Sequence, residues 1–195
     1  MPSQKTSREQ IIYHAIQVFR ERGYHRTSIK DLGQACNIQK AHFYYYFENG
    51  KSQLMAEVLE SVLTYFEERV FVHAYNEELP AEERLDKMAE KMLRAYLGGK
   101  GGCIMGNTVL ETAHLGDEPK LLAITKRFFD AMHAALTHIY ALRDEEVLAS
   151  DKAFQVIQDI EGALIMYQLY EDQRFMARSL GRCLELLKPG DESAA

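Results

Sequence analysis

The chain has 195 residues, 47% of them hydrophobic, and a formal net charge of -6, a length that allows one sizeable helical domain plus a small appendage and excludes two large domains. No apolar run approaches the roughly 18 residues of a membrane span, residues 1–8 lack the apolar core of a signal peptide, and three cysteines without a CxxC pair argue against a disulfide framework or a zinc knuckle. We therefore expect a cytoplasmic protein with free thiols, no membrane partner, no metal and no cofactor.

Charge is unevenly placed along the chain. Residues 1–52 hold eight Lys or Arg against four Asp or Glu, a balance of +4, and the other residues hold 15 against 25, a balance of -10. Random scatter of surface charge is one explanation. The other is a basic head on an acidic body, which would suit a polyanionic partner of the head.

The spacing of apolar residues predicts helices throughout. They recur three and four residues apart, and no alternating β-branched run bounded by turns interrupts them, so the expected fold is all-α. Ser7 and Gln10 have the spacing of a capping box. They open a first helix of about four turns that ends before Gly23.

Two short helices follow. Thr27 and Ser28 are candidate caps for a second helix of about two turns, and Asp31 lies in its first turn, where the helix dipole favours an anion. Asn37 tolerates the left-handed conformation that ends such a helix. A third helix then covers residues 40–47, before Asn49 and Gly50 break it.

The remaining residues predict six more helices, for a total of about nine. A fourth helix runs from Lys51 to about Tyr75, and a loop with Pro80 precedes the fifth. The glycine-rich segment 98–102 lacks the GK(S/T) ending of a P-loop and follows a helix instead of a strand, so it predicts a flexible turn. A sixth helix at 103–115, a seventh to about Ile139 and two terminal helices precede a polar tail.

Helix, turn and helix between Thr27 and Lys51 have the lengths of a DNA-reading unit, whose second helix enters a major groove about 12 Å wide. The second short helix carries a cation, an imidazole and three phenols, groups that bond phosphate oxygens and base edges. The alternative is a helix hairpin with aromatic core residues, and Phe43 and Phe47, four apart, are core in either case. Three consecutive tyrosines cannot all be buried.

This segment resembles the N-terminal signature of the tetracycline-repressor (TetR) family over roughly residues 8–54. The matching residues are Phe19, Gly23, Tyr24, Thr27, Ile29, Leu32, Asn37-Ile38, Phe43-Tyr44 and Tyr46-Phe47. Two features depart from the family pattern: Ala41 stands where glycine is usual, and Lys51 comes one residue later than the usual lysine.

The resemblance implies a set of DNA contacts. Thr27 would bond a phosphate, Lys51 would anchor a phosphate at the start of the fourth helix, and the third helix would supply the other contacts. Of its residues, Gln39, Lys40 and His42 would face base edges or nearby phosphates, and Tyr44, Tyr45 and Tyr46 would meet the DNA backbone. A hydroxyl or a lysine at a helix start lies where the helix dipole favours phosphate.

The resemblance also implies a small-molecule pocket among the middle helices and a homodimer formed by the last two. The candidate pocket residues are Met88, Met92, Tyr96, Cys103, Asn107, Glu111, Phe128, Met132 and Tyr167, each of which would equally suit an ordinary core. The candidate dimer residues are Ile160, Gly162, Leu164, Leu180 and Leu184.

Cys103 lies in a glycine-flanked segment, residues 102–107, that resembles one branch of the family, some of whose members respond to electrophiles or oxidants. A helix N-terminus would favour its thiolate form. The alternative is an inert buried thiol.

The sequence thus predicts a DNA-binding domain at 1–52, a ligand-binding and dimerisation domain at 53–188 and a flexible tail at 189–195. We expect a sequence-specific repressor on palindromic double-stranded operator DNA, released by a small-molecule effector that is thiol-reactive if Cys103 is the sensor. An adaptor that has lost DNA binding is one alternative. The other is a di-iron enzyme using Glu111 and His114, but no second Glu-x-x-His occurs, so we expect no enzyme.

Overall fold

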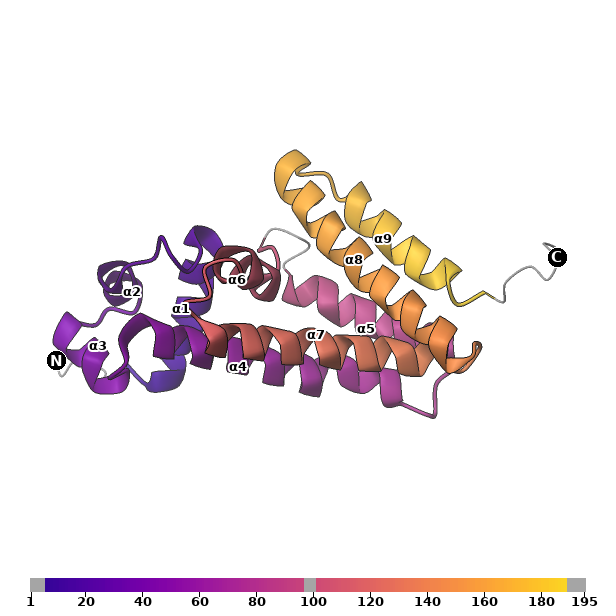
Figure 1. Cartoon of the computed structure of the whole chain (residues 1–195), viewed down its shortest axis with the longest axis horizontal. Helices are drawn as coiled ribbons and strands as arrows, with labels where there is room; N and C mark the ends of the chain where they lie inside the picture. Colours follow the sequence, from indigo (N-terminus) through magenta and orange to yellow (C-terminus); the bar gives the residue numbers. More distant parts are fainter. Residues whose placement is uncertain (1–5, 97–100, 189–195) are drawn as a thin grey trace. The chain divides into compact units, whose positions relative to one another are not determined.

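The computed structural model describes residues 6–96 and 101–188 (Figure 1). Within these residues the backbone forms nine α-helices and one short 3-10 helix and no strand, which confirms the all-α prediction. None of the described helices is both long enough and apolar enough to cross a membrane. The predicted flexible turn at 98–102 and the tail at 189–195 lie wholly or mostly outside the described residues.

Contacts divide the chain into two compact units, residues 1–64 with 103–127 and residues 65–102 with 128–195. The first unit contains α1 (Arg8–Arg22), α2 (Ile29–Ala35), α3 (Lys40–Tyr46), most of α4 (Gly50–Arg69), α6 (Ile104–Thr112) and the start of α7 (Pro119–Tyr140). The second contains the 3-10 helix η1 (Phe71–Tyr75), α5 (Ala81–Ala95), the rest of α7, α8 (Glu146–Tyr170) and α9 (Arg174–Glu185). Packing therefore groups residues 103–127 with the head, and the predicted functional boundary after residue 52 stays a prediction.

Local capping signals determine where the first two helices begin. Ser7 and Gln10 form the predicted capping box of α1, and Ser28 forms a second box with Asp31 at α2. Asn37 adopts the left-handed conformation, with φ of 52°, that the sequence predicted for the turn before α3. Each of these features depends on residues at most a few positions apart.

The core of the head is formed by side chains that the helix periodicity points inward. Ile11, Phe19, Leu32, Phe43 and Phe47 are all buried. Phe43 and Phe47 pack with ring centroids 5.4 Å apart, so α3 is fixed by its own aromatic pair. Burial of this kind leaves the intervening residues of α3 to face outward.

The fourth helix is shorter than predicted. It ends at Arg69, and Phe71–Tyr75 form a 3-10 helix instead of further α-helical turns. Arg84, a buried residue of α5, donates its Nε to the Leu79 carbonyl at 2.7 Å and its Nη1 to the Ala74 carbonyl at 3.3 Å. These bonds hold the chain after η1 in a turn. A longer α4 would not place the Ala74 carbonyl within reach of Arg84.

In the second unit α8 and α9 lie side by side (Figure 1). Arg182 of α9 donates to Asp159 of α8 at 2.8 Å, and the Tyr140 hydroxyl donates to the Cys183 carbonyl at 2.9 Å. Lys152 of α8 pairs with Asp144 and also donates to the Leu186 carbonyl after α9. Polar contacts at the C-terminal end of α9 therefore help to fix it on the rest of the unit.

Candidate nucleic-acid interface

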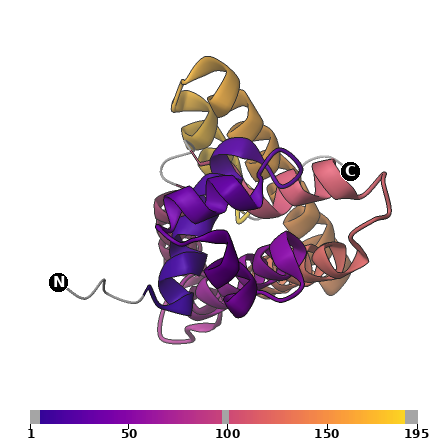
Figure 2. The same ribbon diagram turned by 90° about the vertical axis from the view of Figure 1, so that its left-hand side faces the viewer.

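Helices α2 and α3 border one surface hollow of about 1070 Å³. Figure 2 views the chain from the side of these helices. The lining residues are Ile29, Lys30, Gly33, Gln34, Asn37, Ile38, Gln39, Lys40, His42 and Tyr44. They include two lysines, amides, an imidazole and a phenol, and no acidic side chain, so the hollow presents many hydrogen-bond donors and a positive charge.

The sequence predicted four of these lining residues as DNA contacts: Gln39, Lys40, His42 and Tyr44. All four are exposed, and Tyr45 beside them is 79% exposed. The structure therefore brings these five side chains to the surface of one short helix and its cap. Whether they contact DNA stays a prediction.

Two residues of α2 were missed. Lys30 and Gln34 are exposed and line the same hollow. They lie four residues apart, flanking buried Leu32, so helix periodicity alone would have placed them on the outer face of α2. We add them to the candidate interface.

Tyr46 has a different environment from Tyr44 and Tyr45. Its hydroxyl donates to the Thr6 carbonyl at 2.9 Å, and its own carbonyl accepts from Arg8 Nη1 at 2.7 Å. The Arg8 guanidinium also pairs with Glu57 and lies 4.7 Å above the Phe47 ring. Tyr46 thus joins the end of α3 to the start of α1, and a contact with the DNA backbone would have to compete with that bond.

Thr27 and Lys51 are both engaged inside the protein. Thr27 is 1% exposed, and its hydroxyl donates to the Gly23 carbonyl at 2.6 Å. Lys51 Nζ donates to the carbonyls of Tyr24, at 2.8 Å, and His25, at 3.4 Å, and lies 4.3 Å above the Tyr24 ring. Burial lowers the pKa of Lys51, while nearby carboxylates oppose that shift. The phosphate contacts of Thr27 and Lys51 stay predictions, but both side chains already stabilise the segment after α1.

A polar latch joins this segment to α6 and α7 within the first unit. The Glu118 carboxylate accepts from the hydroxyls of Tyr24 and Ser52, the latter at 2.7 Å. Glu111 accepts the backbone N–H of His25 at 2.9 Å. Burial, followed by the bond to Glu118, raises the pKa of Tyr24, so this phenol stays protonated and keeps donating. We call these five residues the latch.

Gly23 makes this close approach possible. Its φ of 76° is one that residues with a side chain rarely adopt, and a Cβ at this position would overlap the Glu111 carboxylate. Glu111 was predicted to line a ligand pocket, and the structure places it against the head. Glu111 and His114 also fail to form a metal site: the described residues contain no group of three His, Cys, Asp or Glu side chains arranged to hold one.

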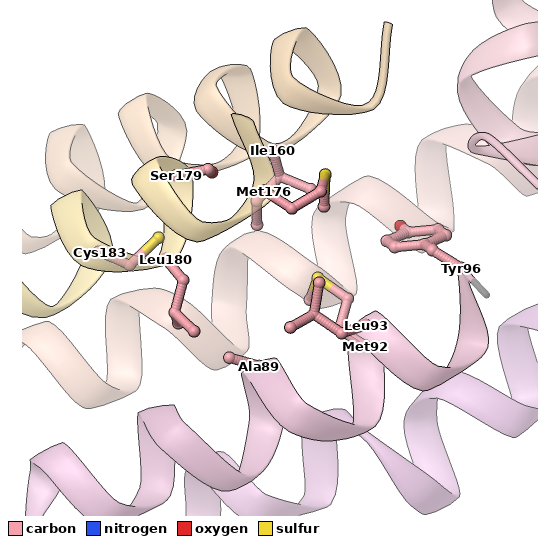
Figure 3. A pocket seen from close by; sticks show the side chains of 9 residues that line it. All are labelled: Ala89, Met92, Leu93, Tyr96, Ile160, Met176, Ser179, Leu180 and Cys183. Atoms are coloured by element: carbon pink, nitrogen blue, oxygen red, sulfur yellow. The ribbon is translucent and has the colours of Figure 1, made fainter. Parts of the chain in front are cut away.

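The other predicted pocket residues are divided between the two units. Cys103 and Asn107 belong to the first unit, whereas Met88, Met92, Tyr96, Phe128, Met132 and Tyr167 belong to the second. Met92 and Tyr96 line a cavity of about 40 Å³ between α5, α8 and α9 (Figure 3). Phe128 packs on Phe66 and Phe71, with centroids 4.9 and 5.7 Å apart, as a core residue would. The predicted pocket as a whole stays a prediction.

Cys103 lies at the N-terminus of α6, as predicted, and its side chain is buried. Its Sγ accepts the backbone N–H of Gly106 at 3.3 Å and so caps the helix. Cys36 and Cys183 are buried as well, and burial raises the pKa of each thiol to about 11. Those two remain neutral thiols at neutral pH.

The predicted dimer residues occupy mixed positions. Ile160 and Leu164 are buried within their own chain, Leu180 and Leu184 are half-buried, and Gly162 is exposed. The large apolar side chains that α8 does expose were missed: Val147, Leu148, Phe154, Ile165, Leu169 and Tyr170. Since α8 is apolar on nearly all sides, its periodicity did not reveal which stripe packs inside the chain.

Comparison with known proteins identifies the head. Residues 11–58 match the family model described as bacterial regulatory proteins, tetR family. The chain is 36% identical over 59 residues to the biofilm operon icaADBC negative transcriptional regulator IcaR of Staphylococcus epidermidis, a match covering 30% of the chain and 31% of that relative. It is 23% identical over 193 residues to the transcriptional repressor DhaR of Mycobacterium sp. strain GP1, covering 95% and 94% of the two chains.

Solved structures share the fold over nearly the whole chain. A TetR transcriptional regulator from Legionella pneumophila has a TM-score of 0.84 at 22% identity, covering 95% of this chain and all of the other. The reduced form of NemR from E. coli has a TM-score of 0.77 at 14% identity, covering 94% and 98%. These similarities confirm the predicted fold, and residues 11–58 are a helix-turn-helix domain of the tetR family of bacterial regulatory proteins, matched by relatives that are named as transcriptional regulators.

Proposed function

We propose that this protein is a repressor that binds double-stranded operator DNA through α2 and α3. The observation that carries this proposal is the hollow bordered by Lys30, Gln34, Gln39, Lys40 and His42, which holds exposed donors and no acidic side chain. Amides and cations at such positions pair with base edges and phosphates in the major groove. Relatives named as repressors support the direction of regulation.

Selection of bound sequences from a random duplex library tests this function. We expect enrichment of one sequence, with an affinity that falls steeply as salt rises because bound Lys residues release counterions from the DNA. A protein that binds no duplex with any salt dependence would instead be the adaptor alternative.

The operator should be palindromic because the protein should bind it as a homodimer. Along α8, Phe154, Gly162, Ile165 and Leu169 form an exposed stripe, and a Cβ at Gly162 would meet no atom within 4 Å. A stripe of large apolar side chains with one small residue suits close packing of a second copy. Two heads related by such a dimer would meet major grooves about 34 to 36 Å apart.

Release by an effector would act through the latch. Because Glu111 and Glu118 hold the segment from Tyr24 to His25, any movement of α6 or of the start of α7 would carry the head with it. Both heads must fit successive grooves, so a small displacement would lower operator affinity. Titrating ligands against the protein–operator complex at fixed salt tests this, and a body ligand that leaves affinity unchanged would contradict it.

Cys103 is the candidate sensor of a thiol-reactive effector. Alkylation of its Sγ would remove the bond that caps α6 and would require this buried side chain to leave its site. Mass spectrometry after mild electrophile treatment, with DNA binding assayed in parallel, tests this role. Undiminished operator binding by fully Cys103-modified protein would exclude it.

A further inference from the structure

Helix α3 has few stabilising features of its own. It has seven residues, the side chain of its N-cap Gln39 makes no capping bond, and its described residues include no acidic residue in the first turn and no basic residue in the last. So short a helix is marginal on its own hydrogen bonds. Its last carbonyls need partners and carry partial negative charge. The C-terminal end of α3 therefore depends on other parts of the first unit.

Arg8, at the start of α1, supplies a cation at the C-terminal end of α3. Its Nη1 donates to the Tyr46 carbonyl at 2.7 Å, and its guanidinium lies 4.7 Å from the centre of the Phe47 ring. The positive charge thus meets the carbonyl end of the helix, where the helix dipole favours it. The Tyr46 hydroxyl adds a second bond, to the Thr6 carbonyl at 2.9 Å. Tyr46 is held by both its backbone and its side chain.

Glu57 of α4 fixes the Arg8 guanidinium in turn. Arg8 Nε donates to Glu57 Oε2 at 2.8 Å and Arg8 Nη2 donates to Oε1, a bidentate pair that suits the planar guanidinium. Gln53, one turn earlier on α4, donates to Glu57 Oε1 at 3.1 Å, and its amide oxygen accepts the backbone N–H of Asn49 at 3.1 Å. These bonds connect the start of α1, the end of α3 and the first turns of α4. We call Arg8 and Glu57 the clamp.

The clamp lies outside the surface that we assign to DNA. Neither Arg8 nor Glu57 lines the hollow bordered by α2 and α3, and all three nitrogen atoms of the Arg8 guanidinium donate within the protein. An ion pair with no net charge adds little to the release of counterions from DNA. Any contribution of the clamp to DNA binding must therefore come from the geometry that it imposes on α3.

We propose that Arg8 and Glu57 are positioning residues for DNA reading and that neither contacts DNA. By fixing the C-terminal end of α3, the clamp keeps Lys40, His42 and Tyr44 in the directions that base recognition requires. This inference rests on the proposed repressor function. Base contacts depend on accurate placement, whereas non-specific attraction to phosphates depends mainly on charge. Loosening α3 should therefore weaken specific binding and leave non-specific binding nearly unchanged.

Glu57→Gln tests the clamp, because electrostatics and positioning predict opposite results for this variant. It removes one negative charge, so charge alone would strengthen DNA binding. Loss of the ion pair should instead weaken binding to the selected operator about threefold to tenfold, no more than the loss of one base contact, and leave affinity for a shuffled duplex within about twofold. Glu60→Gln is the matched control: it removes the same charge from an α4 residue that pairs with Arg127, and both affinities should stay within about twofold.

Arg8→Lys separates positioning from direct contact with a phosphate. Lysine keeps the charge but lacks the planar fork that bonds both Glu57 oxygens and the Tyr46 carbonyl together. Positioning predicts weaker operator binding in Arg8→Lys and in Arg8→Gln, with the salt dependence of both unchanged. A direct phosphate contact would largely survive in Arg8→Lys, and in Arg8→Gln it would be lost with a fall of about one in the salt slope. Fluorescence anisotropy over a range of salt measures these affinities.

Amide hydrogen exchange of the protein free of DNA measures the effect of the clamp on α3. The backbone N–H of Phe47, bonded to the Phe43 carbonyl at 2.9 Å, should exchange faster in Glu57→Gln and Arg8→Lys than in the unmodified protein. The N–H of Leu32 in α2, bonded to the Ser28 carbonyl, is the internal control and should change less. A general loss of stability would accelerate both amides equally, and the same spectra show whether each variant is folded.

The two sides of the ion pair provide independent variants should one of them not fold. Unchanged operator affinity in the folded variants, an equal loss of affinity for both duplexes, or equal acceleration of exchange in α2 and α3 would each overturn the positioning role. If the unmodified protein binds no duplex, the repressor function fails and the role of the clamp in DNA reading fails with it. If the unmodified protein binds its operator and the variants bind it equally well, the clamp alone is wrong.

Discussion

At the scale of single residues, the direction of a side chain decides its role. Thr27 and Lys40 are both residue types that bond phosphates, and the family resemblance assigns DNA contacts to both. Thr27 is buried with its hydroxyl on the Gly23 carbonyl, whereas Lys40 is exposed on the hollow between α2 and α3. The resemblance implied both contacts, but it could not predict that the Thr27 hydroxyl is used within the protein.

Because Thr27 is buried and Lys40 is exposed, substitutions at the two positions should change the free energy of unfolding by different amounts. Thr27→Val should lower the free energy of unfolding by about 1 kcal/mol, because the Gly23 carbonyl loses a buried donor. Lys40→Ala should change that free energy by less than about 0.5 kcal/mol, since its side chain is exposed. Urea denaturation of the two variants measures both values. Equal stability of Thr27→Val and the unmodified protein would contradict the structural role of Thr27.

At the scale of elements, the features that the sequence predicted are those determined by neighbouring residues. The capping boxes of α1 and α2 and the left-handed Asn37 involve residues a few positions apart. Arg84 donates to the Ala74 carbonyl of η1, ten residues earlier, and the latch joins Tyr24 to Glu118, 94 residues later. Such long-range contacts leave no periodic signal in the sequence, which is why η1 and the latch were not predicted.

The α2 cap should make stability depend on pH. Bonds from the Ser28 side chain and backbone hold the pKa of Asp31 below its usual 3.8. Its carboxylate therefore stabilises the folded state at pH above about 3.8, and this contribution is lost as pH falls through the lowered value. Denaturation of the unmodified protein and of Asp31→Asn between pH 7 and pH 2.5 should show a stability difference that vanishes in acid. A difference that stays constant with pH would be inconsistent with this cap.

The latch should contribute to the stability of the first unit. Glu118→Ala removes the acceptor of the Tyr24 and Ser52 hydroxyls and should lower the free energy of unfolding by about 1 to 3 kcal/mol. Glu118→Gln keeps an acceptor oxygen and should lose less. Glu21→Ala, at an exposed position of α1, serves as a control. If all three variants unfold at the same urea concentration, the latch has no energetic role.

At the scale of the whole molecule, the proposed account requires two copies of the chain. Ile165 and Leu169 are 57% and 67% exposed on α8, and a charge there would oppose burial against a second copy. Ile165→Asp should therefore shift the protein from dimer to monomer in sedimentation velocity. Leu110→Asp, at an equally exposed apolar position of α6, should leave the dimer intact. A dimer unaffected by Ile165→Asp would place the interface elsewhere.

The uneven distribution of charge along the sequence is also a property of the whole molecule. Residues 1–52 carry a balance of +4, and the hollow that we assign to DNA lies within them. Helix lengths, core aromatic residues and family were all accessible from this part of the chain. Predicting the pocket required knowing how helices far apart in sequence pack, and the apolar stripes of the body did not supply that information.

Operator binding by Lys40→Ala, measured by fluorescence anisotropy on the selected duplex over a range of salt, tests the central claim most directly. We predict that its affinity falls about tenfold or more, whereas Lys87→Ala, which removes an exposed lysine from α5, binds like the unmodified protein. Equal affinities of the two variants at every salt concentration would contradict the assignment of the α2–α3 surface to DNA.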